Sequence, residues 1–576
     1  MGAAATGLSR RYRGPGIARA ETARQDHEED ETGFEKEDES EGETSEAQVA
    51  VESEAQGEVE GKGEAEGGAF EEAVVTRKSR AAPPSLDLDH ATMRQIGRQV
   101  ADLVADHLAT LRDQPAYRTL DRVGARALFE LDPPEQPTSF DAIMQSFQER
   151  VVPHHAREPH PRFLGYIPSC PTFPAVAGDW LATGFNFFAG VWPVAAGPNE
   201  VELTVLEWFR RWMGMPDGSR GLLTSGGSAA TVTAVVAARH AALGDQSGDL
   251  PRLTVYCSDQ AHSSFAKAAW IAGISRDHVR SVPSDHTFRM RVDALGELVR
   301  ADRRAGLKPF LLCATAGATN TGAVDPLHAL ADFARDQKLW LHTDSAYAGF
   351  SVLTKRGRAL LDGLGRADSL TLDPHKWLYV PFECGCLLAR DPSTLEAAFS
   401  VHPAYLRAVR ARDGRIGAAG LGEASGAPDE SGVNFADYGE QLTRYSRALK
   451  VWVSVRYFGT AAIAAAQDQA MALAELAETI ARESPDLEVL SPAQFGIVCF
   501  RVRPPGAPDD AALNALNERV NDRVNKTGFV LMSSTRLRGV LSLRLCIPGY
   551  RTREEDVRAV MDLVRRTAHE VISEDS

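Results

Sequence analysis

From about residue 200 onward, short apolar runs alternate with longer stretches of helical periodicity. The runs show no alternation of polar and apolar residues, which is typical of strands that are buried on both faces. Strands separated by helices form mostly parallel sheets that helices cover on both sides. This pattern predicts an α/β fold with a mostly parallel sheet. The predicted strands are Leu253–Cys257, Phe310–Ala314, Leu339–His342, Ser369–Leu372 and Gly385–Ala389.

The first 80 residues have a different composition, rich in Glu, Gly, Ala and Ser. Between Glu21 and Glu72 they carry 21 acidic residues against three basic ones, which accounts for the chain's net charge of −16. Such a segment cannot bury enough apolar surface to offset its ordering entropy, so we predict that it is disordered. We interpret it as a solvating extension rather than as an acidic tail that binds a partner. The rest of the chain is nearly neutral, which argues against a nucleic-acid partner.

Two further regions flank the predicted sheet. Apolar residues three to four positions apart between Met93 and Leu108 predict a helix, and a second helix is predicted over Phe140–Val152. After residue 450, a long helical stretch precedes three strands that indicate a smaller α+β domain: Phe495–Val502, Gly528–Met532 and Val540–Cys546. The expected organisation is a disordered acidic extension (1–80), an N-terminal helical segment (81–172), a large α/β domain (173–449) and a small C-terminal domain (450–576).

The seven cysteines are spread singly along the chain, apart from one Cys-Gly-Cys. An odd number without Cys-x-x-Cys or Cys/His spacing argues against a disulfide framework and against a metal site. We therefore expect reduced thiols in a cytoplasmic protein. The apolar runs stop well short of the roughly 20 residues needed to cross a bilayer, so no membrane association is expected.

A lysine stands at the end of one predicted strand, in the segment Ser369–Tyr379. The apolar run leads into Asp373 and a proline, and His375 and Lys376 follow. Open α/β sheets bind their ligands at the carboxyl ends of their strands. Apolar residues on both sides make Lys376 poorly placed for a surface charge, whereas its amine could form a Schiff base with an aldehyde cofactor.

An acid stands at the end of another predicted strand. Asp344 follows the run 339–342 and precedes the small residues Ser345 and Ala346. A pyridine cofactor needs an acid beside its ring nitrogen, because the protonated ring is the electron sink. Alone, Asp344 could equally be a helix N-cap. Its pairing with Lys376 favours the cofactor interpretation.

Two more strand ends carry polar groups. Thr224–Ser228 is a Gly-rich turn that opens a helix over Ala229–Arg239, and the free amides at a helix N-terminus bind phosphate well. Such turns are also common as simple helix caps. His262 follows the run 253–257 and could stack on a cofactor ring, although a lone histidine at a strand end is more often structural.

Together these segments resemble the group II pyridoxal-phosphate (PLP) dependent amino-acid decarboxylases, which include aromatic L-amino-acid, histidine and glutamate decarboxylases. The resemblance covers about residues 85–576 and implies the fold type I architecture of aspartate aminotransferase, with 173–449 as the PLP-binding domain. It also implies an obligate homodimer with both active sites near the subunit interface. It is densest in His160–Phe163, Thr224–Ser228, Asp259–Ser264, Thr315–Gly322, His342–Gly349 and Asp373–Trp377.

The resemblance implies a role for each matching residue. Lys376 would carry the cofactor as a Schiff base, and His375 would contact its phosphate or move protons. Asp344 would pair with the pyridinium nitrogen, while Ala346 and the catalytic His262 would pack on the two ring faces. The other expected contacts are Gly227 and Ser228 at the phosphate, Thr319 at the cofactor, and Tyr166, Ile167, Pro168 and Ser169 at the substrate.

Tyr405 decides the expected reaction class. It matches the tyrosine on the family's mobile catalytic loop, where a phenol can supply a proton to the carbon that has lost CO2. Family members with phenylalanine there tend towards oxidative deamination to an aldehyde. We therefore predict plain decarboxylation to an amine, with an aldehyde synthase as the alternative. The following residues, Ala408–Asn434, are dense in Gly and Ala, as a mobile lid would be.

The expected substrate is an aromatic L-amino acid. Residues 153–200 lack the arginine-rich surface expected for an acidic substrate, with Arg157 and Arg162 the remaining candidates. Thr443 stands where aromatic-acid decarboxylases often carry glycine or serine in the side-chain pocket, so its bulk could exclude a large ring. The segments Arg412–Asn434 and Val191–Asn199 are also longer than is typical of the family.

A binding protein with a catalytically silent PLP fold is the alternative from a different class. Its acidic extension would then recruit a partner. The intact set of Lys376, Asp344, His262 and Tyr405 argues against it.

Overall fold

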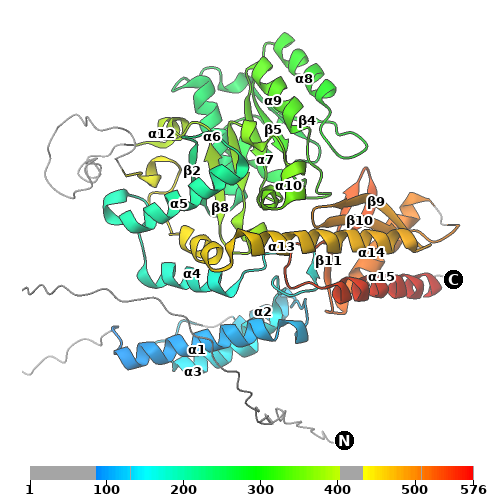
Figure 1. Cartoon of the computed structure of the whole chain (residues 1–576). Coiled ribbons are helices and arrows are strands. Elements are labelled where there is room, and N and C mark those ends of the chain that lie inside the picture. Colours follow the sequence, from blue (N-terminus) through cyan, green and yellow to red (C-terminus); the bar gives the residue numbers. More distant parts are fainter. Residues whose placement is uncertain (1–85, 130–131, 402–431, 507–508, 575–576) are drawn as a thin grey trace, which may run out of the picture. The chain divides into compact units, whose positions relative to one another are not determined.

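The computed structural model describes residues 86–129, 132–401, 432–506 and 509–574 (Figure 1). Residues Ser85–Ser576 form one compact unit. The extension that we expected to be disordered, residues 1–80, lies outside the described residues. Across the described ranges, no helix combines the length and the apolar character that crossing a membrane requires.

A seven-stranded sheet in the order β2-β8-β7-β6-β5-β3-β4 forms the centre of the large α/β region. Pairs among β4, β3, β5, β6 and β7 are parallel, and β8 is antiparallel to both of its neighbours. The predicted mostly parallel sheet is therefore confirmed. The five predicted strands are present as β3 (Leu253–Ser258), β5 (Lys308–Thr315), β6 (Trp340–Asp344), β7 (Ser369–Leu372) and β8 (Gly385–Ala389).

Two strands of this sheet were not predicted from the sequence. They are β2 (Arg220–Thr224) and β4 (Val279–Val282), which form the two edges. Edge strands are partly open to solvent, so β4 tolerates Arg280 and Ser281 inside its short apolar run. Without a continuous apolar pattern, such a strand gives little signal in the sequence.

Helices cover both faces of the sheet. In β3, Val255 and Cys257 pack with residues of α6 (Gly227–Leu243) and α7 (Ser263–Ile271). The intervening Tyr256 belongs to a second core that includes residues of α8 (Val292–Arg304) and α9 (Leu327–Gln337). Neighbouring residues of one strand thus enter two different cores, and every residue of β3 is buried. This double burial explains why the predicted strands lack polar alternation.

A five-stranded sheet in the order β1-β11-β12-β10-β9 forms the smaller α+β region. All its pairs are antiparallel except β1 with β11. The edge strand β1 comes from the N-terminal part of the chain, so distant segments share this sheet. The strands are β1 (Phe163–Leu164), β9 (Leu487–Gln494), β10 (Ile497–Val502), β11 (Leu531–Leu537) and β12 (Val540–Cys546).

The strand predicted over Gly528–Met532 was placed too early. Gly528 adopts φ +70° and belongs to the turn before the strand, and β11 runs on through the polar residues Ser533–Arg536. Their side chains alternate between partly buried and exposed, so the apolar pattern ended before the strand did. The prediction for Val540–Cys546 is confirmed, and β9 was missed because its sequence mixes Glu, Ser, Pro and Gln with apolar residues.

The long helix α13 (Ala448–Glu483) contacts elements of both regions (Figure 1). It packs against α4 (Phe173–Phe185) and α5 (Ala196–Met213) and also against β9, β10 and α15 (Glu554–Glu574). Gly459, at φ +73°, marks a kink within it. The other helices of these regions are α10 (Lys355–Leu360), α11 (Pro374–Trp377), α12 (Ser393–Phe399) and α14 (Asp510–Lys526).

The N-terminal segment contains α1 (His90–Ala109), α2 (Arg122–Phe129) and α3 (Phe140–Ser146). The helix predicted between Met93 and Leu108 is confirmed, and Asp89 caps it by accepting two backbone N–H groups. The second predicted helix is α3, which continues as a π-helical turn over Phe147–Val151. None of the three α-helices contains a fully buried residue, and their apolar side chains are half-buried or exposed in the single chain.

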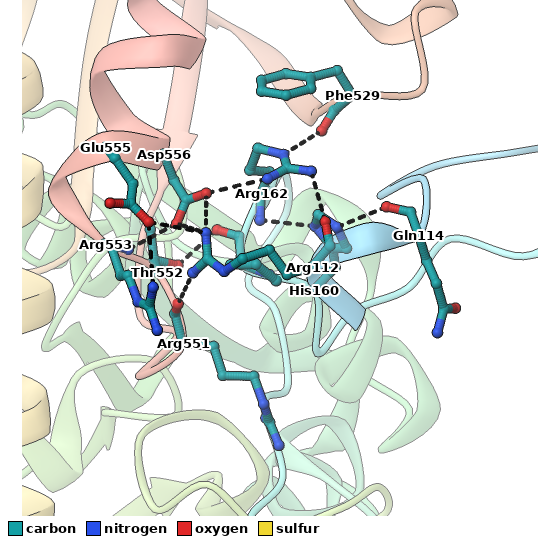
Figure 2. Close-up of polar contacts among 11 residues, drawn as sticks. Arg112, Gln114, His160, Arg162, Phe529, Arg551, Thr552, Arg553, Glu555 and Asp556 are labelled. Carbon is teal, nitrogen blue, oxygen red and sulfur yellow. Dashed lines mark hydrogen bonds and ion pairs between the residues drawn. The ribbon is translucent and has the colours of Figure 1, made fainter. Parts of the chain in front are cut away.

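Asp556 of α15 links this helix to the N-terminal segment (Figure 2). It is 2% exposed, and its carboxylate accepts hydrogen bonds from Arg112 at 2.8 and 3.0 Å and from Arg162 at 3.3 Å. It also accepts the backbone N–H of Arg553 at 3.0 Å, just before the helix begins. One carboxylate therefore both caps the first turn of α15 and neutralises two arginines from elsewhere in the chain.

His160 completes this cluster in its neutral form. Its Nδ1 accepts the backbone N–H of Arg162 at 2.9 Å, so Nε2 carries the proton and donates to the carbonyl of Gln114 at 3.0 Å. Burial, followed by the charge of Arg162, lowers the pKa of His160 to about 4. The ring therefore adds no third positive charge to the cluster near neutral pH.

Replacing Asp556 by Asn should destabilise the protein, because Arg112 and Arg162 would lose their shared counter-charge. We expect a loss of about 3 kcal/mol, as for other buried ion pairs that lose one partner. The shift in the urea midpoint, followed by circular dichroism, measures it. The control is Glu554→Gln on the same helix, whose ion pair with Arg558 is exposed and contributes less than about 1 kcal/mol. Equal midpoints for the two variants would contradict a stabilising role for the cluster.

Candidate active site

The loops after five strands of the large sheet meet at a cavity of about 500 Å³. Strands β2, β3, β5, β6 and β7 run in the same direction, so their carboxyl ends lie at one edge of the sheet. The cavity is lined by Tyr166, Ile167, Ser225, Gly226, Gly227, Ser228, Ala229, His262, Ser264, Thr315, Gly317, Thr319, Asp344, Ala346, Tyr347, Asp373, His375, Lys376 and Glu383.

Lys376 lies at this cavity because α11 begins directly after β7. Pro374 occupies the first turn of α11, where the missing N–H has no cost. The neighbouring Trp377 is completely buried, while Lys376 lines the cavity. Its Nζ lies 2.9 Å from Oδ2 of Asp373. The structure thus holds the only lysine among the described lining residues beside a buried carboxylate.

Asp344 ends strand β6 and faces the same cavity. Its Oδ1 accepts the backbone N–H of Ala346 at 3.1 Å, which orients the carboxylate. Burial raises the pKa of Asp344, and the Ala346 N–H and the charges of Lys376 and His262 oppose this shift. A cationic ring nitrogen in the cavity would stabilise the ionised form of Asp344 and so offset the effect of burial on its pKa. The alternative role of Asp344 as a helix N-cap is not what the structure shows. It accepts one N–H within a turn, but no α-helix begins there.

The Gly-rich turn after β2 opens helix α6, which begins at Gly227. A Cβ atom at Gly227 would lie 3.0 Å from Oδ2 of Asp373 and 3.2 Å from Cβ of Ala346, so a side chain would crowd this corner. Gly226 is the N-cap, and no side chain there accepts a hydrogen bond from the helix amides. The first amides of this 17-residue helix, together with Ser228, can bind an anion.

His262 has a structural role and also lies at the cavity. It is the N-cap of α7, and its Nδ1 accepts the backbone N–H of Ser264 at 3.2 Å and lies 2.8 Å from the Ser264 hydroxyl. It also lines the cavity. Because Nδ1 accepts the amide hydrogen bond, the neutral ring carries its proton on Nε2.

His375 is held from the side of β8. Its Nδ1 donates to the carbonyl oxygen of Cys384 at 2.6 Å, and burial lowers the pKa of its ring. The ring also lies against Phe382, with 5.0 Å between centroids. Its Nε2 is 3.7 Å from Oδ2 of Asp373. The histidine is therefore neutral and oriented beside the acid that contacts Lys376.

Most of the predicted site residues lie together at this cavity. Pro168 and Ser169 are buried next to the lining residues Tyr166 and Ile167 but do not line the cavity themselves. Thr443 is exposed and lies outside the lining. Tyr405 and most of the predicted lid lie outside the described residues. The predicted residues that do line it are Tyr166, Ile167, Gly227, Ser228, His262, Thr319, Asp344, Ala346, His375 and Lys376.

Arg544 holds two loops of the cavity lining, and this role was not predicted from the sequence. It lies on β12 and is 3% exposed. Its guanidinium donates to the carbonyl oxygens of Thr319 at 2.7 Å and of Tyr166 at 2.6 Å, and also to the Ser533 hydroxyl at 3.2 Å. One side chain thus joins two lining loops to the smaller sheet. The available signal was an arginine inside the apolar run Val540–Cys546.

Three comparisons with known proteins agree with this geometry. Residues 124–503 match the pyridoxal-dependent decarboxylase conserved domain. An aromatic-L-amino-acid decarboxylase of Bacillus atrophaeus is 36% identical over 487 residues, which are 84% of this chain and 98% of that protein. A phenylacetaldehyde synthase of Arabidopsis thaliana is 29% identical over 490 residues, covering 84% of this chain and 96% of that protein. The crystal structure of Oryza sativa TDC with PLP and tryptamine superimposes with a TM-score of 0.78 at 29% identity, covering 84% of this chain and 99% of that one.

These observations define a PLP-dependent lyase of fold type I, as the sequence predicted. The chain belongs to the pyridoxal-dependent decarboxylase family. The residues present fit the cofactor: a lysine for its aldehyde, a half-buried acid for its ring nitrogen, and a glycine corner at a helix N-terminus for its phosphate.

Replacing Arg544 by Lys should weaken cofactor binding, because a lysine cannot hold the Thr319 and Tyr166 carbonyls at the same time. We expect the Kd for PLP to rise about tenfold, equivalent to about 1.4 kcal/mol. Quenching of intrinsic fluorescence during titration of the apoprotein with PLP measures it. Arg536→Lys, an exposed arginine of the adjacent strand β11, is the matched control. An unchanged Kd in Arg544→Lys would show that the two loops hold their positions without it.

Proposed function

We propose that this chain decarboxylates an aromatic L-amino acid to the corresponding amine and CO2. The observation that carries the proposal is the cavity lining, in which Lys376 is the only Lys or Arg among the described residues. An acidic side chain in this cavity would lack a cationic partner and would be costly to bury. The similarity to an aromatic-L-amino-acid decarboxylase supports the same choice.

When bound, PLP supplies the electron sink that allows the carboxyl group to leave. In our proposal Lys376 binds the cofactor covalently, Asp344 pairs with its ring nitrogen, and Thr319 helps to position it. Gly227, Ser228 and the first amides of α6 bind the phosphate, with His375 beside them. Ala346 and His262 pack on the two faces of the ring. Tyr405 delivers the proton that replaces the lost carboxyl group.

The substrate side chain would lie against Tyr166 and Ile167, which border the cavity. Pro168 and Thr443 do not line the cavity, so they would influence substrate binding by positioning the segments that contain them. Thr443 precedes Arg444, whose backbone carbonyl accepts the N–H of Ala189 and whose side chain donates to the Ala189 carbonyl at 3.0 Å. This pairing anchors the start of the long segment Val191–Asn199, which would border the pocket.

The functional unit that we propose is a homodimer. Helix α4 exposes four large apolar side chains: Phe173, Trp180, Leu181 and Phe185. Apolar residues of α1, α2 and α3 are exposed in the same way, for example Met93, Val123 and Ile143. Apolar surface on several helices is typical of a protein–protein interface, and a second copy of the chain would cover it.

We also place the enzyme in the cytoplasm. All seven cysteines are free and buried, and all seven belong to the two hydrophobic cores that flank the large sheet. Unpaired thiols used as small core residues are typical of a reducing compartment. Titration of the unfolded protein with a thiol reagent, without prior reduction, should find every cysteine in the free form.

The substrate can be identified by product analysis with a panel of L-amino acids. The purified protein should be yellow, and an aromatic substrate should give the amine and CO2 in equal amounts. Lys376→Ala should lose both the visible absorption band and turnover, because it has no amine to bind the cofactor. Mass spectrometry of the products, with assays for peroxide and ammonia, distinguishes the outcomes.

Tyr405→Phe separates the two reaction classes. If Tyr405 delivers the proton, this variant should shift the products from amine towards aldehyde, peroxide and ammonia. An unchanged product ratio would remove Tyr405 from its proposed role. An aldehyde product from the wild-type enzyme would make it an aldehyde synthase, the class to which the Arabidopsis relative belongs.

The dimer proposal predicts that a charge on α4 dissociates the subunits. In Leu181→Glu, a carboxylate replaces a 49% exposed leucine, and burying it in an interface would be strongly unfavourable. Sedimentation velocity at micromolar concentration should show a dimer for the wild type and a monomer for this variant. The control is Leu360→Glu on α10, where the leucine is similarly exposed at 48%; this variant should remain dimeric. A monomeric wild type would exclude the proposal.

A further inference from the structure

Asp373 occupies the corner of the cavity between Lys376 and the Gly-rich turn. It follows β7 directly and is 3% exposed. Its Oδ2 forms an ion pair with Lys376 Nζ at 2.9 Å. Its Oδ1 is also buried but has no hydrogen-bond partner among the described residues. Half of this carboxylate is therefore used, and half is left without a donor.

An unpartnered oxygen on a buried carboxylate is costly, so a structural role would normally satisfy both oxygens. Both oxygens of Asp373 instead lie close to Gly227, within 3.0 and 3.3 Å of the position that a Cβ atom would take there. Burial is the main cause that raises the pKa of Asp344, and the like charge of Asp373 adds to it in the same direction. The unsatisfied oxygen and the crowded position at Gly227 together point to a function for Asp373 in this cavity.

The chemistry of Lys376 requires a proton acceptor at this place. Its nitrogen can attack an aldehyde carbon only after an ammonium proton has left and freed the electron pair. Two other titratable groups of the lining each use one atom elsewhere, since His375 Nδ1 donates to the Cys384 carbonyl and Asp344 Oδ1 accepts the Ala346 N–H. Asp373 already contacts Nζ and has a free oxygen.

We propose that Asp373 is the positioning residue and proton acceptor for Lys376 during attachment of the cofactor, an inference that rests on the proposed role of Lys376. Asp373 holds the lysine as an ammonium ion and takes one of its protons. The nitrogen electron pair then bonds to the aldehyde carbon, whose π electrons move to the oxygen. A second nitrogen proton and the proton held by Asp373 pass to that oxygen, which leaves as water. A protonated carbon–nitrogen double bond remains, and Asp373 is ionised again.

The test follows attachment rather than turnover. Apoprotein is mixed with PLP in a stopped-flow instrument, and the rise of the visible absorption band is recorded. Asp373→Asn keeps the shape of the side chain but cannot take a proton. Its band should form about 100-fold more slowly, at the lower end of the contribution of a positioned acid–base group. A rate equal to that of the wild type would overturn the proposal.

Further measurements separate this role from a structural one. Binding of inorganic phosphate to the apoprotein should not weaken in Asp373→Asn, because the variant removes a negative charge beside the first amides of α6. Asp373→Glu restores a carboxylate and should recover at least part of the rate, whereas equally slow Asn and Glu variants would contradict proton transfer. Asp362→Asn, which removes an exposed acid paired with His328, is the control and should match the wild type.

The failure of this inference can be distinguished from failure of the proposed function. A wild-type protein that forms no visible band with PLP, or a Lys376→Ala variant that still forms one, would remove Lys376 from its role. A normal band in the wild type, lost in Lys376→Ala but formed at full speed in Asp373→Asn, would overturn only the role of Asp373.

Discussion

The common direction of β2, β3, β5, β6 and β7 is the constraint on which the site depends. Each of these strands supplies one or more polar groups at its last residue or within the next four, and parallel alignment brings those groups to one edge of the sheet. The strands are buried on both faces, so the sheet cannot shift its register without exposing apolar side chains. A cavity at such an edge has rigid walls even though loops and short helices provide its lining.

Buried arginines connect this edge to the rest of the chain. Arg544 joins the lining loops at Tyr166 and Thr319 to the smaller sheet. Arg444 is completely buried, and it donates to Glu202 of α5 at 2.7 Å and to the carbonyl of Leu223 in β2 at 2.7 Å. Arginine suits both places because its planar fork can donate to several carbonyl or carboxylate oxygens at once. Segments far apart in the sequence are therefore held at the cavity by a few side chains with many hydrogen bonds.

The charges inside the cavity are unevenly matched. Asp373 is buried and Asp344 is half-buried, whereas Lys376 is the only lysine or arginine in the described lining. Burial raises the pKa of Asp344 and lowers that of His375, so the site favours neutral forms of groups that water would leave charged. A cofactor with a cationic ring nitrogen reduces this imbalance at Asp344. The protein thus places destabilising charges where a bound group can compensate them.

The sequence by itself determined the class of the fold, because double burial of the parallel strands leaves continuous apolar runs that few other architectures need. It also predicted Lys376, Asp344, Gly227 and His262 as site residues, since each lies shortly after such a run or opens the next helix, and all four line the cavity. The tertiary structure alone showed Arg544, whose partners lie on other elements of the chain, and the close approach of Asp373 to Gly227. It also placed Thr443 outside the lining and extended β11 beyond its apolar start. Contacts between distant segments leave no periodic pattern in the sequence, because they depend on how packed elements meet in space.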